Sequence, residues 1–345
     1  MLARVAQSLY WMSRYLERAE HTARLLDVNL HQMLDQTPRA AERRWDQMLT
    51  SLRAPLPAEG TGDAYAITRS LTFDEANGAS IFSCVGMARD NARQVRERIS
   101  SEMWEQINRL YLSVRGTTID EIWQAEPHEF FRTVKEGAHL FQGITDGTMS
   151  HGQGWQFIQA GRYIERGGAT ALLLDTHLTS YLEGSAGRDD LQWVGLLKSC
   201  TAFEAYCKVH TVRMQPERVA EFLLFDAEFP RSVRFVAGMV QASLQAISRA
   251  TGARSPARAE RLAGKLRAVL DYSQVDEILA EDVHGYLTNI QDLCTAIHTA
   301  LHQTYILQQD VAGRRRWVEE QADSAGPGSA EAQQLTEQPM QQQQQ

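Results

Sequence analysis

Two stretches of this sequence are near-copies of each other, and this repeat constrains the fold more than any other feature. Residues 13–30, SRYLERAEHTARLLDVNL, align with residues 161–178, GRYIERGGATALLLDTHL, at an offset of 148 (161 minus 13). A segment carried twice suggests two halves related by an approximate two-fold axis, with half-repeats of about residues 1–145 and 146–310. The positions that keep their residue type are, in the first copy, Arg14, Tyr15, Glu17, Arg18, Thr22, Ala23, Leu25, Leu26, Asp27 and Leu30.

Both copies have the hydrophobic period of an α-helix. Apolar and small residues recur at alternating steps of three and four, which places them on one helical stripe. Similar stripes, capping signals and first-turn prolines recur along the chain, and no strand alternation is evident. We therefore expect an all-α, multi-helix bundle of roughly ten helices with an internal duplication. The stripe of the first copy is Leu9, Met12, Leu16, Ala19, Ala23, Leu26 and Leu30.

The end of the chain differs in composition from the rest. Residues 313–317 read GRRRW, and the segment from about residue 321 is rich in Gln, Gly, Ser and Pro. Such a segment cannot bury enough apolar surface to offset its ordering entropy. We expect one helical domain over residues 1–312, and a basic stub with a disordered, Gln-rich tail over residues 313–345.

Charge and cysteine content restrict the class of protein. The formal net charge is -8 and the pI is near 5.7, which argues against sequence-independent binding to nucleic acid. The four cysteines form no CxxC pair, which is typical of a reducing compartment. The N-terminus lacks a signal-peptide pattern, and no apolar run is as long as a membrane span. These features predict a cytoplasmic protein with no nucleic-acid or membrane partner.

The repeated Glu-Arg pair must find its ion-pair partners on other helices. Adjacent helical residues point about 100° apart, so Glu17 and Arg18 cannot pair with each other. If the two repeat helices meet, Glu17 can reach Arg166, and Glu165 can reach Arg18. The periodicity favours a buried ion-pair set that fixes the helix register. The alternative is a cleft in which Glu17 and Glu165 are candidate catalytic groups and arginines bind an anionic substrate.

Other charged residues are weaker candidates. Asp27 and Asp175 recur near the apolar side, where we expect each to cap a neighbouring helix. The glycine-dense segment 143–155 predicts a flexible connection or a mobile element over a site, but it lacks the P-loop pattern. The candidate substrate- or anion-binding residues are Arg14, Arg18, Arg89, Arg93, Arg162, Arg166 and Arg231.

Metal-binding patterns are incomplete. Glu281 and His284 have the ExxH spacing of di-iron bundles, but such sites need a second pair and two further glutamates. His298 and His302 share a helix face without a third ligand cue. No metal site and no cofactor are therefore expected, and these four residues are the only weak metal candidates.

Four stretches of the chain carry a family resemblance. They are LYWMSRYLERAEHTARLLDVN at residues 9–29, ARDNARQVRERISSEMWEQIN at 88–108, GWQFIQAGRYIERGGATALLLD at 154–175 and PERVAEFLLFDAEFPRSVRFV at 216–236. Together they resemble the bacterial alpha-E domain family over about residues 1–310. The chain departs from that pattern at Gly167 and Gly168, where the family more often has Ala and an acidic residue. These two glycines leave open whether the second copy keeps the polar contacts of the first.

The resemblance also implies partners. Members of the family look like companions of a circularly permuted ATP-grasp protein, often with transglutaminase-like or proteasome-like peptidases nearby. That setting implies a peptide-synthesis or peptide-tagging system. We interpret the chain as a non-catalytic helical partner subunit of an ATP-grasp-type ligase that holds substrate or partner through Glu/Arg-lined surfaces. Two alternatives are an enzyme that uses Glu17 and Glu165 as acid-base groups, with arginines binding a carboxylate or phosphate, and a bare scaffold.

Overall fold

The fold is all-helical over the residues that the computed structural model describes, which are 1–33, 38–55, 63–124, 127–184, 190–210, 214–252 and 257–307. No β-strand occurs in these ranges. The predicted all-α class is therefore confirmed over these residues. The tail expected over residues 313–345 lies outside the described part of the chain.

The helices follow one another with short connections. In chain order they are α1 Ala3–Met33, α2 Pro38–Leu52, α3 Ala64–Phe73, α4 Ile81–Gln94, α5 Ser101–Arg115, α6 Ile119–Gln124, α7 Pro127–Thr148, α8 Gln153–Leu182, α9 Asp190–Ser199, α10 Phe203–Val209, α11 Pro216–Phe225, α12 Val233–Ala250, α13 Arg258–Tyr272, α14 Val275–Ala280 and α15 Val283–Leu301. A 3-10 turn at Arg96–Arg98 precedes α5, and a π-helical turn at His302–Leu307 follows α15.

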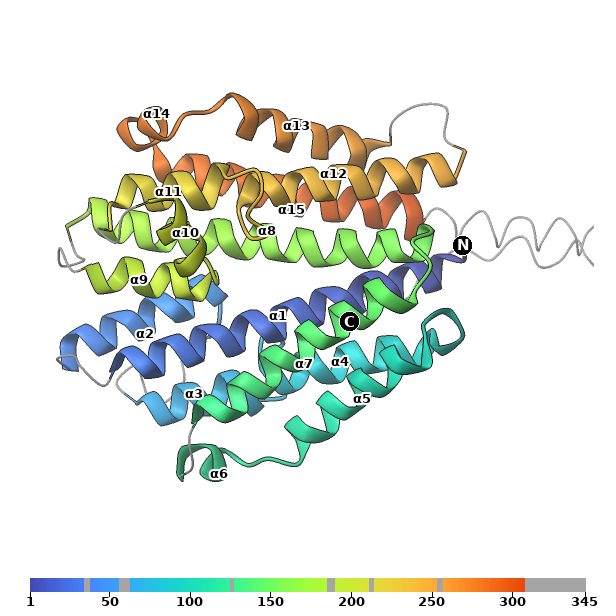
Figure 1. The fold of residues 1–345 in the computed structure, drawn as a ribbon, viewed down its shortest axis with the longest axis horizontal. Coiled ribbons are helices and arrows are strands. Elements are labelled where there is room, and N and C mark those ends of the chain that lie inside the picture. The colour runs from blue at the N-terminus through green and yellow to red at the C-terminus, as the bar shows by residue number, and fades with distance from the viewer. Residues whose placement is uncertain are drawn as a thin grey trace, which may run out of the picture.

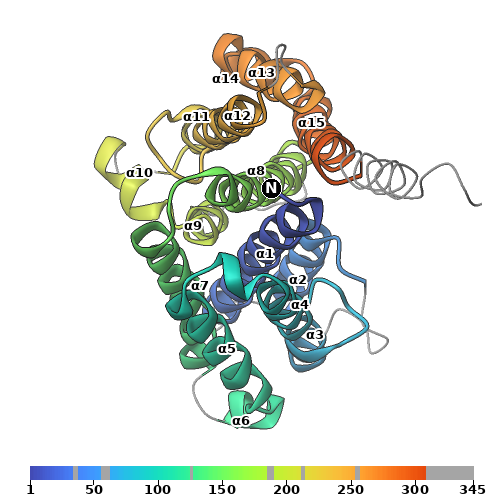
Figure 2. The ribbon, with the colours of Figure 1, turned by 90° about the vertical axis from the view of Figure 1, so that its right-hand side faces the viewer.

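The two long helices that contain the repeated segments, α1 and α8, lie against each other at the centre of the bundle (Figures 1 and 2). Helices α4 and α7 pack on α1, and α12 and α15 pack on α8. An outer helix completes each side: α5 contacts α4 and α7, while α13 contacts α12 and α15. The hydrophobic core is continuous across both sides and includes the stripes of both repeats.

Small residues set how closely α1 approaches α8. A Cβ at Gly161 would lie 2.4 Å from the carbonyl oxygen of Tyr10 and 2.5 Å from Oγ of Ser13. Ser13 in turn donates a hydrogen bond of 2.7 Å to the carbonyl oxygen of Ile158. Glycine is therefore required at position 161, because any side chain would push the two backbones apart. This close contact fixes the register in which charged residues on the two helices meet.

The glycine-dense segment 143–155 is mostly helical, so the prediction of a flexible or mobile connection there is wrong. Helix α7 continues through Gly143 and Gly147 to Thr148, and α8 begins at Gln153. A Cβ at Gly143 or Gly147 would meet nothing within 4 Å. Both glycines occupy open positions of α7, where they are tolerated at a modest cost in helix stability.

Candidate functional site

The two Glu-Arg pairs contact each other across the α1–α8 interface. Arg166 donates to Glu17 from Nε at 2.6 Å and from Nη2 at 2.9 Å. Arg18 donates from Nε to Glu165 at 2.6 Å, and Arg14 donates from Nε to the other oxygen of Glu165 at 2.7 Å. The prediction that Glu17 reaches Arg166 and that Glu165 reaches Arg18 is confirmed.

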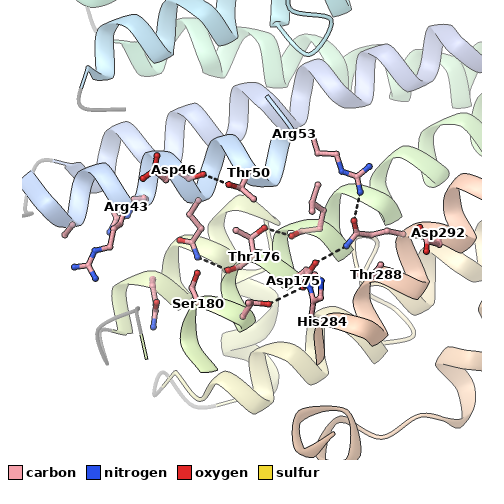
Figure 3. Close-up of a pocket in the computed structure, with 17 residues that line it drawn as sticks. Arg43, Asp46, Thr50, Arg53, Asp175, Thr176, Ser180, His284, Thr288 and Asp292 are labelled. Atoms are coloured by element: carbon pink, nitrogen blue, oxygen red, sulfur yellow. Dashed lines mark hydrogen bonds and ion pairs between the residues drawn. The ribbon is translucent and has the colours of Figure 1, made fainter. Parts of the chain in front are cut away.

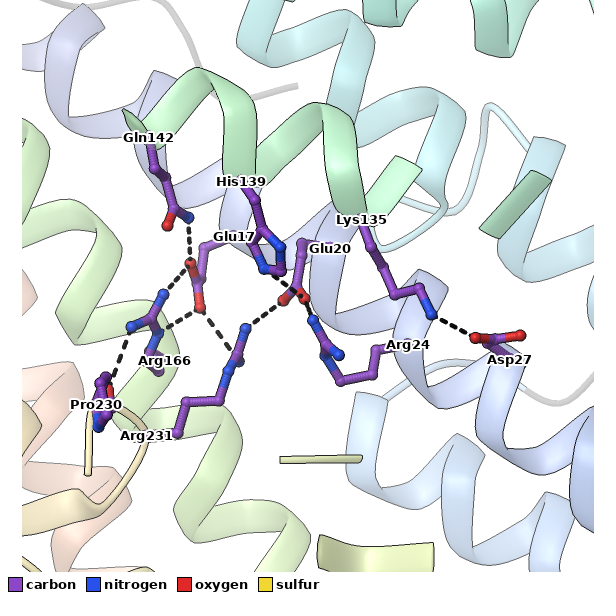
Figure 4. Close-up of polar contacts among 10 residues, drawn as sticks. All are labelled: Glu17, Glu20, Arg24, Asp27, Lys135, His139, Gln142, Arg166, Pro230 and Arg231. Carbon is purple, nitrogen blue, oxygen red and sulfur yellow. Dashed lines mark hydrogen bonds and ion pairs between the residues drawn. The ribbon is translucent and has the colours of Figure 1, made fainter. Parts of the chain in front are cut away.

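The Glu17 side of this interface is filled by further polar side chains (Figure 4). Arg231, which precedes the N-cap residue of α12, places Nη2 at 2.6 Å from Glu20 and Nη1 at 3.4 Å from Glu17. Gln142 of α7 donates to Glu17 at 3.2 Å, and Arg24 pairs with Glu20 one turn along α1. The side chain of Glu17 is only 2% exposed, so this cluster is sealed between helices.

The arginines decide the protonation state of Glu17. Burial by itself raises the pKa of this carboxyl group, but the charges of Arg166 and Arg231 and the hydrogen bond from Arg166 outweigh it and lower the pKa to about 2. The pKa of the neighbouring His139 is also shifted. Burial lowers it first, and the charges of Arg24 and Arg231 lower it further, to about 4. Near neutral pH, Glu17 is therefore a permanent carboxylate and His139 is neutral.

The Glu165 side is different, because Glu165 lines a cavity of about 460 Å³. Arg14, Arg18 and Arg53 also line it, so three guanidinium groups face a single carboxylate. Burial raises the pKa of Glu165, but Arg14 and Arg18 outweigh burial, so the pKa is lowered overall. The cavity walls therefore carry a net positive charge. The remaining lining residues are Trp11, His21, Ser51, Leu52, Ala79, Ile164, Gly168, Ala169, Leu172, Gln291, Cys294, Thr295 and His298.

Two histidines in the wall add neutral polar groups. His21 is buried, and its Nε2 atom has no hydrogen-bond partner among the described residues. Burial, followed by the charge of Arg231, lowers the pKa of His21 to about 4. His298 contacts the hydroxyl of Tyr10 through Nδ1 at 2.8 Å, and burial and Arg14 lower its pKa to about 4. A buried imidazole nitrogen without a partner is costly unless something else in the cavity satisfies it.

A larger cavity of about 770 Å³ adjoins the first along α8 (Figure 3). Arg53, Leu172 and Gln291 line both cavities. At this junction Arg53 donates to Gln291 at 2.7 Å, and Gln291 donates to Asp175 at 3.3 Å. Together the two cavities follow one face of α8, between α1 and α2 on one side and α15 on the other.

The two repeated aspartates bind side chains and do not cap helices, so that prediction is wrong. Asp27 contacts Nδ1 of His128 at 2.6 Å and pairs through its other oxygen with Lys135. Asp175 contacts Nδ1 of His284 at 2.9 Å. Each aspartate is held by a histidine in the first turn of a neighbouring helix, because both lie where α1 or α8 passes the start of α7 or α15.

Three of the predicted anion-binding arginines lie away from the cavity. Arg89 donates to Asn108 at 2.8 Å, and Arg93 is exposed with Asp90 at 3.5 Å. Arg162 pairs with Gln159 and has its guanidinium carbon 4.8 Å from the ring centroid of Tyr163. Arg14 and Arg18 do line the cavity, whereas Arg166 and Arg231 belong to the sealed cluster. Arg53 also lines the cavity but could not be identified from the sequence, because its position depends on where α2 ends relative to α15.

The weak metal candidates do not converge. His284 pairs with Asp175, and Glu281 is exposed just after α14. His298 contacts Tyr10, and the ring centroid of His302 lies 6.2 Å from that of His298. Within the described ranges, three ligand atoms instead come together at Asp27, His31 and His128. The sequence signal for this group is faint: Asp27 and His31 are one helical turn apart, but His128 is remote.

Comparison with protein families settles the classification. Residues 1–306 match the model of Alpha-E, described as a predicted alpha-helical domain with a conserved ER motif. The chain belongs to the Alpha-E family. In this Alpha-E chain, the Glu-Arg pairs at positions 17–18 and 165–166 exchange partners between the two central helices.

The descriptions of the relatives of this Alpha-E chain give no activity. An uncharacterized protein of Mycobacterium bovis and one of Mycobacterium tuberculosis are each 25% identical to it over 318 residues, and the match covers 86% of this chain. The chain spans about a third of the length of these relatives, 35%. No solved structure matches it. None of the described helices is both long and apolar enough to cross a membrane.

Proposed function

We propose that this Alpha-E chain is a non-catalytic helical partner subunit of an ATP-grasp-type ligase in a bacterial peptide-synthesis or peptide-tagging system. In this proposal, the cavity beside Glu165 holds a carboxylate group of the substrate. The observation that carries the proposal is the charge of that cavity, where Arg14, Arg18 and Arg53 face the single carboxylate of Glu165. Guanidinium groups bind carboxylates through paired hydrogen bonds, so an excess of them favours an anionic ligand.

The protonation states argue against the alternative in which the chain is itself an acid-base enzyme. A general acid or base works best with a pKa near the operating pH. The pKa of Glu17 is about 2, and that of Glu165 is lowered in the same direction. Both carboxylates are committed to arginines, which suits binding and positioning better than proton transfer.

We infer an internal duplication, which the order of the helices supports. Helices α1 to α7 correspond in order to α8, α9 and α11 to α15, with α10 inserted. Several matched helices have equal lengths: α3 and α11 have 10 residues each, α5 and α13 have 15, and α6 and α14 have 6. We place one helical domain over residues 1–312, with half-repeats of about 1–145 and 146–310.

The packing partners and polar contacts repeat as well. The pairs α1–α4, α1–α7, α4–α5 and α5–α7 have the counterparts α8–α12, α8–α15, α12–α13 and α13–α15. In the first half Asp27 pairs with a histidine through one oxygen and with Lys135 through the other. In the second half Asp175 pairs in the same way with His284 and Gln291.

The duplication gives the cavity a physical origin. At the offset of 148, Glu20 and Arg24 of the sealed cluster correspond to Gly168 and Leu172 of the cavity wall. Arg231 directly precedes the capping residue of α12, as Ala79 directly precedes that of α4. The space beside Glu17 is therefore filled with charged side chains, whereas the corresponding space beside Glu165 is open. A ligand site requires such open space.

The length of the relatives agrees with a partner role. In the mycobacterial relatives the matched region is 35% of a longer chain. A helical module joined to further segments in one protein is suited to work beside another domain. Transglutaminase-like or proteasome-like peptidases of the same system are further candidate partners.

Co-expression with the ATP-grasp protein of the same system tests the partner role. We expect a stable complex, ligation activity that needs both proteins, and no turnover by this chain alone. Arg53→Gln should reduce ligation while leaving the complex and the melting temperature unchanged, whereas the exposed Arg93→Gln serves as the matched control. Absence of a complex, combined with turnover by this chain alone, would overturn the proposal in favour of an enzyme.

A further inference from the structure

We propose that Asp27, His31 and His128 form a binding site for one divalent transition-metal ion, and that zinc fits it best. The site lies at the junction of α1 and the start of α7. None of its three residues lines the cavity beside Glu165. The inference is therefore independent of the carboxylate site and of the ligase partner.

The geometry brings three ligand atoms together. Asp27 and His31 are one turn apart on α1, and His128 is in the first turn of α7. One ligand atom from each residue lies within 4.8 Å of the other two. Oδ1 of Asp27 is 2.6 Å from Nδ1 of His128 and 3.5 Å from Nδ1 of His31. Ligands of a tetrahedral zinc ion are separated by about 3.3 Å, so small side-chain rotations suffice to bind the metal.

The two imidazoles stack on each other beside Asp27. The ring centroids of His31 and His128 are 3.3 Å apart, with 30° between the ring planes. Both side chains are partly exposed, at 57% and 35%, so neither is forced into this contact by burial. Nδ1 of His128 contacts Oδ1 of Asp27 at 2.6 Å, and Nδ1 of His31 contacts the carbonyl oxygen of Asp27 at 3.0 Å, so both rings are already held at the position that a shared metal ion would take.

The ligand types select the class of metal. Two imidazoles and one carboxylate suit zinc and neighbouring transition metals, whereas magnesium and calcium prefer sets made only of oxygen ligands. Lys135 pairs with Oδ2 of Asp27 and leaves Oδ1 for the metal. Such an outer hydrogen-bond partner orients the carboxylate that binds the ion. The ammonium charge of Lys135 also opposes a second cation, which limits the affinity. Exposure of the histidines leaves a fourth position for water.

The second half of the chain offers an internal comparison. The counterparts of Asp27 and His31 at the offset of 148 are Asp175 and Thr179. Asp175 has a histidine partner, His284, but position 179 cannot supply an imidazole. The second half therefore has two of the three ligands, and we expect zinc to bind in the first half only.

The test is a zinc titration of the full chain after treatment with EDTA, read by competition with a fluorescent chelator. We expect one zinc ion per chain. His31→Thr, which installs the residue of the second half, should weaken binding about tenfold or more. Lys135→Gln should strengthen binding, because it removes an opposing charge. The matched control His284→Ala should bind zinc like the wild type, and thermal melting should show that every variant is folded.

X-ray absorption at the zinc edge gives a second readout, in which we expect two imidazole ligands and bonds of about 2.0–2.2 Å. The proposal is overturned if the wild-type chain binds no zinc, if folded His31→Thr binds it as tightly as wild type, or if binding depends on His284.

Discussion

The carboxylate of Glu17 on α1 receives two hydrogen bonds from the guanidinium group of Arg166 on α8, at 2.6 Å and 2.9 Å. Both side chains are almost fully buried. Arg231 approaches the same carboxylate to 3.4 Å, so two arginines depend on Glu17 for charge balance. This cluster joins α1 and α8 to the segment before α12, and it carries the structural role that the repeated motif predicts.

Glu17→Gln should lower the free energy of unfolding by about 3–5 kcal/mol, because it leaves Arg166 and Arg231 buried with less negative charge to balance them. Urea unfolding of the variant and the wild type measures this difference. The matched control is Glu129→Gln, since Glu129 is exposed and lies 3.4 Å from Arg132. The control should change stability by less than about 0.5 kcal/mol. Equal effects of the two substitutions would show that the cluster does not stabilise the fold.

The stability that Glu17 provides should depend on pH in a defined window. Its pKa is about 2 in the folded chain and 4.5 in the unfolded chain, so the folded state favours the ionised form. The contribution is fully present above pH 4.5 and is lost as the pH falls toward 2. The stability difference between wild type and Glu17→Gln should therefore be constant from pH 7 to about 5 and shrink below pH 4.5. Urea unfolding across this range checks it, and a difference that instead grew on acidification would contradict the assignment.

Two glycines of α8 should respond to alanine in opposite directions. A Cβ at Gly168 would meet nothing within 4 Å, so Gly168→Ala should stabilise the chain by about 0.5–1 kcal/mol through helix propensity. A Cβ at Gly161 would lie 2.4 Å from the Tyr10 carbonyl oxygen, so Gly161→Ala should destabilise by about 1–3 kcal/mol. Thermal melting of the two variants provides the comparison. A stabilised Gly161→Ala would mean that α1 and α8 are not in close contact there.

The sequence was informative where the Glu-Arg motif recurs at residues 17–18 and 165–166. The contacts Glu17–Arg166 and Glu165–Arg18 follow from one repeated motif on two helices that meet, and no other element needs to be placed. The unequal exposure of the two glutamates could not be predicted. It depends on Arg231, which comes from a segment 211 positions after Glu20, and on Ala79, which precedes the N-cap of α4 and lines the cavity.

The group of Asp27, His31 and His128 could not be identified from the sequence, for a similar reason. His128 lies 101 positions after Asp27, and only the packing of α7 on α1 brings them together. The prediction of a flexible connection over residues 143–155 failed because most of this segment is helical. Glycine density indicates a loop, but the open faces of α7 tolerate Gly143 and Gly147.

Of the two Glu-Arg sites, the one at Glu17 is sealed, and we propose that the one at Glu165 binds a carboxylate. A sealed variant, Ala79→Arg with Gly168→Glu and Leu172→Arg, installs in the cavity the residue types of Arg231, Glu20 and Arg24 in the sealed cluster. Its melting temperature should remain close to that of the wild type, because the same residue types form an ion-paired cluster beside Glu17.

Calorimetric titration with glutarate, a simple dicarboxylate, tests the claim most directly. We expect the wild-type chain to bind one glutarate per chain, the folded sealed variant to bind none, and the control Arg93→Gln to bind like the wild type. Failure of the wild-type chain to bind glutarate, or equal binding by the sealed variant, would contradict the account.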